Sequence, residues 1–147
     1  MRYLSTLVLI AALALVAAAQ RAENNTDEQL RARNAPDLFV LGVTASGPDR
    51  SGRSTFNIDV QNMGAKTVTA IEWEYAPANS VGRYGADNPL KFRNAGANIR
   101  PDEKKKLSKQ VNLYVSLLIT QFRLNSVRVM RVEYDDGSHW QRPADEK

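Results

Sequence analysis

Apolar and polar residues alternate over short segments through most of this chain. Residues 54–61 are the clearest case, with Phe56, Ile58 and Val60 at every second position and polar residues between them. Successive side chains of a strand point to opposite faces of a sheet, so this period of two predicts a strand with one face in the core and the other in water.

The same alternation predicts further strands, separated by clusters of Gly, Pro, Asn and Asp. We expect strands over residues 38–45, 54–61, 66–76, 90–94, 106–111, 126–134 and 138–142, with a short edge strand at 81–84 inside the loop 77–89. In 66–76, Ile71, Trp73 and Tyr75 point inward while Val68 is out of phase, which predicts a bulge near Ala70. About seven short strands, with a buried Trp in the third, predict an all-β, immunoglobulin-like antiparallel β-sandwich over residues 37–143.

Residues 111–123 fit two patterns. Val111, Leu113 and Val115 alternate as in a strand. Leu113, Leu117 and Phe122 also fit one face of a helix. We favour a strand here, and an alternative use of this apolar stretch is contact with a partner subunit.

Two turns carry specific expectations. In Asn62-Met63-Gly64-Ala65, Asn62 and Gly64 can accept left-handed backbone angles. In the last hairpin, a three-residue loop with Gly137 left-handed places Val132 opposite Trp140, whereas a two-residue turn would place Glu133 there. We expect the first register, with Trp140 in the core and His139 outward beside Glu133.

The first residues indicate export. After a start carrying Arg2, residues 7–18 are continuously apolar, and small residues precede Gln20. This pattern predicts a signal peptide over 1–19, and the apolar run is short for an uncleaved membrane anchor, the alternative. Residues 20–36 are polar and predict a flexible linker, and 144–147 predict a disordered tail. We therefore expect a periplasmic or extracellular protein without a stable membrane anchor after cleavage.

Composition removes several classes of chemistry. The chain has no cysteine and only one histidine, which excludes disulfides, thiolate sites and lipid attachment through cysteine, and argues against the common zinc sets and a Ser/His/Asp triad. The formal charge of +4 falls to +3 when Arg2 is removed, too little to indicate nucleic acid. We expect no catalytic residue, no metal site and no cofactor.

Three motifs resemble the bacterial exported immunoglobulin-like modules of the FxLYD kind. They are the strand end Val60 to Val68 with its Asn-x-Gly, the aromatic strand Ile71 to Tyr75, and the turn Ile99 to Glu103. The chain lacks the Asp expected after the aromatic strand, and Asp102 stands where Gly is usual. The resemblance implies an envelope or extracellular module and supplies no catalytic motif.

Two groups of polar residues are candidates for a binding surface. Arg83 and Tyr84 lie in the long loop before residue 90, and loops at the end of a sandwich are common recognition sites. Lys104, Lys105 and Lys106 form a basic cluster that could meet an anionic polymer, although lysines also protect sheet edges.

The remaining polar candidates are explained without a binding or catalytic role. We expect His139 to be an ordinary surface residue. Glu72 and Glu74 are expected to be exposed and paired with Arg131 rather than to act as a catalytic pair.

These features predict a non-catalytic exported module that binds an envelope or extracellular protein or an anionic polymer. One alternative is a structural accessory subunit of a surface assembly. A glycan-active enzyme is the third, because it would need a buried carboxylate pair or a polar cleft.

Overall fold

The computed structural model describes residues 34–77, 83–112, 119 and 122–144, which lie in one compact unit, Ala32–Lys147. This unit is built almost entirely from strands, as the alternation predicts. They are β1 (Leu38–Ser46), β2 (Arg53–Asn62), β3 (Val68–Tyr75), β4 (Leu90–Ile99), β5 (Lys104–Asn112), β6 (Val127–Tyr134) and β7 (His139–Gln141), with a short 3₁₀ helix η1 (Leu124–Ser126) before β6.

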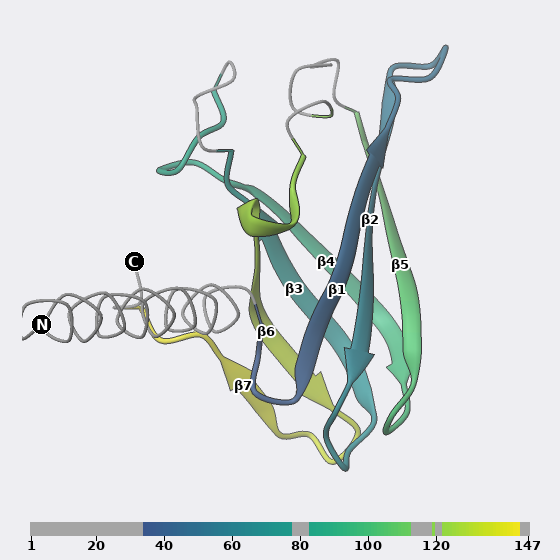
Figure 1. The fold of residues 1–147 in the computed structure, drawn as a ribbon, viewed down its shortest axis with the longest axis vertical. Helices are drawn as coiled ribbons and strands as arrows, with labels where there is room; N and C mark the ends of the chain where they lie inside the picture. The colour runs from purple at the N-terminus through teal and green to yellow at the C-terminus, as the bar shows by residue number, and fades with distance from the viewer. Residues whose placement is uncertain (1–33, 78–82, 113–118, 120–121, 145–147) are drawn as a thin grey trace, which may run out of the picture. The chain divides into compact units, whose positions relative to one another are not determined.

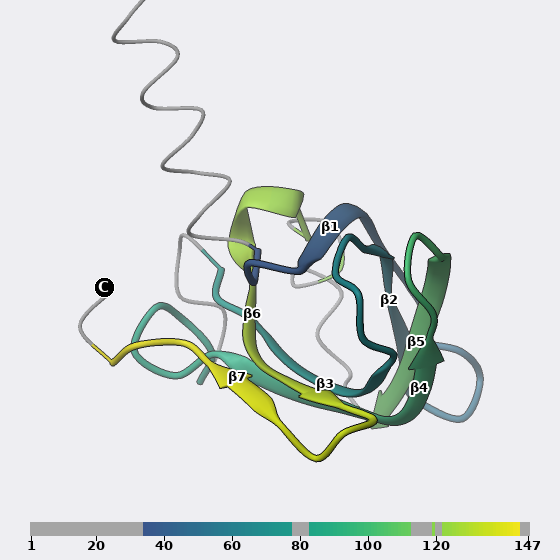
Figure 2. The same ribbon diagram turned by 90° about the horizontal axis from the view of Figure 1, so that it is seen from below.

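The strands form two antiparallel sheets that pack face to face (Figures 1 and 2). One sheet has the order β1-β2-β5 and the other the order β4-β3-β6-β7. The chain changes sheet at the β4–β5 turn, so β4 and β5 lie side by side along one edge of the sandwich (Figure 2). The predicted immunoglobulin-like sandwich of about seven strands is therefore confirmed.

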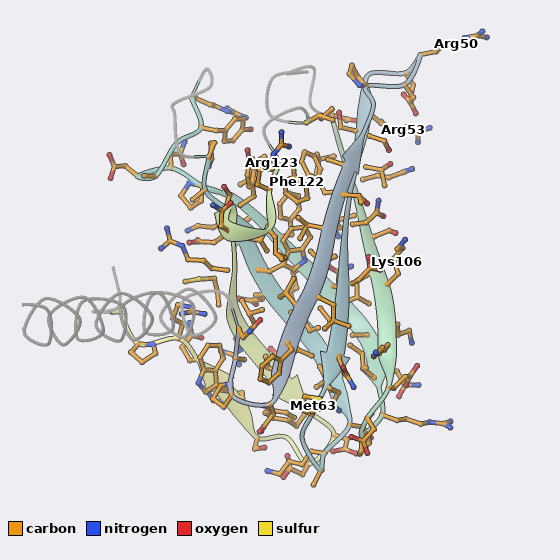
Figure 3. The ribbon with its side chains drawn as sticks, viewed as in Figure 1. Arg50, Arg53, Met63, Lys106, Phe122 and Arg123 are labelled. Atoms are coloured by element: carbon orange, nitrogen blue, oxygen red, sulfur yellow. The ribbon has the colours of Figure 1, made fainter. Side chains whose placement is uncertain are left out.

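Aromatic side chains fill the space between the sheets. Trp73 stacks on Phe92 with ring centroids 4.1 Å apart, and Phe56 lies 5.2 Å from Phe92. Phe122, just before η1, points between the sheets and meets the edges of Phe56 and Tyr75 (Figure 3). Burial of these rings supplies much of the apolar area that stabilises a small sandwich.

The predicted bulge near Ala70 is present. The pairing of β3 with β4 shifts between Val68 and Ala70, because Val68 pairs with Ile99 but Ala70 pairs with Ala95. The extra residues are on β4, where Gly96 has a positive φ of 70°. In its pairing with β6, β3 itself carries an extra residue, Thr69, because Val68 pairs with Tyr134 and Ala70 with Glu133. This bulge brings Val68 into phase with the core, where its side chain is fully buried.

The turn after β2 forms for a different reason from the one predicted. Among the described residues, positive φ values do not include Asn62 or Gly64. Asn62 is fully buried and uses its side chain instead, accepting a hydrogen bond from the Gly64 N–H at 3.0 Å. Gly64 is required because a Cβ there would come within 2.8 Å of the Asp37 Cβ.

The last hairpin has the expected register. Val132 pairs with Trp140, Glu133 pairs with His139, and Gly137 has a φ of 80°. Trp140 is half-buried and packs against the core from its edge, so it is less enclosed than predicted because β7 is the outer strand of its sheet.

Several predicted boundaries differ from the observed ones. The strands predicted over 90–94 and 106–111 extend over Leu90–Ile99 and Lys104–Asn112. The strand favoured over 111–123 ends at Asn112 among the described residues, and 124–126 form η1, while 113–118 and 120–121 lie outside the described residues. Of the predicted edge strand 81–84, residues 81–82 also lie outside them.

The end of the predicted linker belongs to the packed domain. Asn34 and Ala35 are buried, and the Asn34 side-chain oxygen accepts a hydrogen bond from the Val40 N–H at 2.8 Å. The predicted signal peptide, residues 20–33 and residues 145–147 lie outside the described residues. Within the part of the chain that the structure describes, no helix is long and apolar enough to span a membrane.

Candidate binding surface

Arg83 and Tyr84 pack on each other in the connection between β3 and β4. The Arg83 guanidinium lies 5.1 Å from the Tyr84 ring centroid and donates to the Tyr84 hydroxyl at 3.0 Å. Asn88 donates to the Arg83 carbonyl at 2.8 Å, and the Tyr84 ring is half-buried against the core. Residues 83–88 therefore form a local turn in which Tyr84 serves the fold as well as the surface.

The three lysines do not form a single patch. They lie in β5, where Lys104 and Lys106 pair with the outward residues Gln61 and Asp59, and Lys105 pairs with the inward residue Val60. Lys106 points away from the core and approaches Asp59 at 3.7 Å (Figure 3). The Lys105 ammonium instead donates to the Asn98 carbonyl on β4 at 3.1 Å. Strand alternation thus divides the cluster between the two faces of the sheet.

His139 is exposed on β7, opposite Glu133 as predicted. Within the described ranges, no group of three or more His, Asp or Glu side chains is placed to hold a metal ion.

The predicted site residues are not brought together. Arg83 and Tyr84 lie at the end of the sandwich where β3 leads to β4, and the β4–β5 turn before Lys104 lies at the opposite end (Figure 1). His139 shares that second end, but it is on β7, at the edge of its sheet remote from β4 and β5. These residues therefore cannot line one binding site.

The outer face of the four-stranded sheet carries an ordered set of charges instead. Arg93 of β4 reaches Glu72 at 3.7 Å and Glu133 at 3.1 Å, and Glu133 also accepts from Arg131 at 3.1 Å. The exposed pairing predicted for Glu72 is present, but its partner is Arg93 rather than Arg131. Because the members are at least partly exposed, each pair contributes at most about 1 kcal/mol.

Glu74 differs from the prediction. It was expected to be exposed, yet only 8% of it is accessible. Among the described residues, no hydrogen bond or ion pair reaches its carboxylate, although Lys91 and Arg128 are its cross-strand neighbours on β4 and β6. Among the described residues, only the Asn34 side-chain nitrogen is both enclosed and without a hydrogen-bond partner, so the Glu74 carboxylate reaches water through the small exposed part of its side chain.

A bulge in β6 lies close to Glu74 in the pairing of the sheet. The pairing of β3 with β6 shifts between Glu72 and Trp73, which pair with Arg131 and Val129, so Met130 is the extra residue. Bulges re-aim side chains, and Met130 lies on the outer face together with Glu74. Both line a shallow depression of about 330 Å³, whose other lining residues are Glu72, Trp73, Lys91, Phe92, Arg93 and Gln141.

The sequence holds one signal for this bulge. Val127 and Val129 are inward at a spacing of two, but the next inward residue is Val132, at a spacing of three. Such a break in phase marks a bulge in a strand. It does not show which side chain of the neighbouring strand becomes enclosed.

Comparison with known proteins does not assign the chain to a family. No family model and no curated protein matches the chain. Among solved structures, a Northeast Structural Genomics Consortium target, SoR45, is 12% identical with a TM-score of 0.38, over 71% of this chain and 79% of that chain. The putative ApaA protein from Bordetella pertussis is 16% identical with a TM-score of 0.36, over 76% of this chain and 90% of that one. At these TM-scores neither likeness supports a statement about function.

Proposed function

We propose that this protein is an exported, non-catalytic binding module whose binding surface is the outer face of the four-stranded sheet. The observation that carries this proposal is Glu74, which is 8% accessible, has no partner among the described residues and lines a depression of about 330 Å³.

The free hydrogen-bonding capacity of Glu74 supports this surface. Its carboxylate has no protein partner among the described residues, and a hydrogen bond to a charged group contributes about 1.5–3 kcal/mol. A ligand that donates to Glu74 would add such a bond, whereas Glu72 and Glu133 are already engaged by arginines. Export is supported by the signal-peptide pattern of residues 1–19, so the partner is expected in the envelope or outside the cell.

Capture of a partner from an envelope extract tests the proposal. The full chain is compared with Glu74→Gln, which keeps the shape of the side chain and removes its charge, and with Lys104→Ala/Lys106→Ala on the other sheet. We expect Glu74→Gln to lose the partner and the lysine variant to keep it. The reverse pattern would move the binding surface to β5 and point to an anionic polymer.

A third result of the same experiment would favour the structural alternative. Phe39 and Leu41 are 37% and 46% exposed on the edge strand β1. In this third result, both variants still capture one protein in stoichiometric amounts and in high salt. It would indicate an accessory subunit held by apolar surface, and would contradict binding at the outer face of the four-stranded sheet.

The burial of Glu74 also favours a second candidate, a glycan-active enzyme. Glycosidases use two carboxylates, one of which acts as a general acid in a partly buried setting. Glu74 and Glu72 share one face and line the same depression. New reducing ends released from envelope glycans by the wild-type protein, and absent with Glu74→Gln, would replace the binding module by an enzyme.

A further inference from the structure

We infer that the depression binds the zwitterion of an α-amino acid, with the ligand ammonium at Glu74 and the ligand carboxylate at Lys91. The inference rests on the proposed function and names the ligand chemistry of the same surface. It is drawn from the charges that the sheet leaves unpaired at this place.

The ammonium is assigned to Glu74 because this carboxylate is the free acceptor of the depression. The other acid that lines it, Glu72, lies 3.7 Å from Arg93. Glu74 has no such partner among the described residues and lines the depression. An ammonium group carries three N–H donors and a positive charge, and charge-assisted hydrogen bonds are about twice as strong as neutral ones.

The carboxylate is assigned to Lys91 for a complementary reason. Lys91 is the cross-strand partner of Glu74 on β4, is exposed, and enters no ion pair among the described residues. Arg128 flanks Glu74 on the opposite side, in β6. A simple cation would be repelled by these neighbours, whereas a ligand with both charges satisfies the carboxylate and a cation together.

The size and the walls of the depression also fit a small ligand. A volume of about 330 Å³ is at the lower end of the range for small-molecule sites. Met130 gives an adaptable apolar wall for a short side chain, and Gln141 adds an amide. Trp73 and Phe92 are 1% and 4% accessible, so neither ring offers an open face on which a sugar could stack.

Titration of the ¹⁵N-labelled full chain with L-alanine, followed by NMR, tests the inference. We expect saturable shifts at the amides of Glu74, Lys91, Met130 and Gln141. N-acetyl-L-alanine lacks the ammonium and L-alanine amide lacks the carboxylate, so each should bind at least about tenfold more weakly, which corresponds to one lost charged contact. Tighter binding of dialanine would assign the ligand to a peptide, and equal or weaker binding to the free amino acid.

Variants separate this site from unspecific binding. Glu74→Gln should abolish the shifts, and the matched change Asp59→Asn on the other sheet should leave them unaltered. Lys91 is exposed, so Lys91→Met should fold, and it should remove the preference for L-alanine over its amide. Shifts that are absent with wild-type protein, or unchanged in Glu74→Gln, would overturn the inference.

The capture experiment and the L-alanine titration together distinguish a wrong ligand class from a wrong binding surface. If Glu74→Gln loses its envelope partner while L-alanine gives no shift, the binding surface stands and the ligand class is wrong. If the partner is still captured by Glu74→Gln and L-alanine gives no shift, both are wrong.

Discussion

The side-chain amide of Asn62 donates to the carbonyl oxygen of Ile99 at 3.0 Å, joining two turns that are far apart in the sequence. The same amide donates to the Lys66 carbonyl at 2.8 Å. The Asn62 backbone exchanges hydrogen bonds with Asp102 and Glu103 at 2.9 and 3.1 Å. Asn62 therefore fastens the end of β2 to the β4–β5 turn, where the chain passes from one sheet to the other.

Replacing Asn62 by Ala should lower the free energy of unfolding by about 3 kcal/mol. The change leaves the buried Ile99 carbonyl and the partly buried Lys66 carbonyl without this donor, and an unsatisfied buried group costs about 1–3 kcal/mol. Urea denaturation measures the loss. The control is Asn57→Ala, whose bonds to Thr44 and Ser108 are exposed and whose loss should cost less than about 1 kcal/mol.

Replacing Asp102 by Gly should stabilise the folded domain. It has a positive φ of 61°, a conformation that glycine adopts without the steric penalty of a side chain. We expect Asp102→Gly to raise the free energy of unfolding by about 0.5 kcal/mol, the relief of strain exceeding the added entropy of the unfolded chain. Asp102→Ala should lower it, because Ala tolerates this region less well than Asp. Thermal or urea denaturation that ranks Ala above Gly would contradict this explanation.

Gly64→Ala should destabilise the domain by about 2 kcal/mol or more. The new methyl group would meet the Asp37 Cβ at 2.8 Å, and overpacking at a well-packed site costs about 1–3 kcal/mol. In an Asp37→Gly background the obstructing Cβ is absent, so the same change should cost less than about 1 kcal/mol. A double-mutant cycle measures this coupling, and additive effects would show that the contact is not the cause.

Because Tyr134 resists deprotonation in the folded protein, the free energy of unfolding should fall at high pH. Burial, with a smaller effect of the Asp37 carboxylate, raises the pKa of Tyr134 from 10.0 to about 12. Between these values the folded protein keeps a proton that the unfolded chain releases, so this contribution is full below pH 10 and is lost as the pH rises toward 12. Tyr134→Phe should flatten the decline in urea midpoint between pH 10 and about pH 12. An equal decline in both proteins would assign it to other groups.

The local pattern of the sequence determined the strands and their inner faces. Phe56, Ile58 and Val60 lie in the core as their spacing predicts, because side-chain direction in a strand alternates whatever the neighbouring strands are. The hairpin register also followed from local residues, since Gly137 takes the left-handed position and Trp140 favours the apolar Val132 as its cross-strand neighbour.

Only the tertiary structure determined which polar side chains lie together on the surface and which are buried. The order of strands puts Arg83 and His139 in separate places and leaves Lys105 bonded to β4, while Lys104 and Lys106 face outward. Glu74 and Met130, the extra residue of a bulge in another strand, come to line the same depression. A residue's own pattern fixes the direction of its side chain, whereas its burial depends on neighbours that reach it only when distant strands pair and shift register.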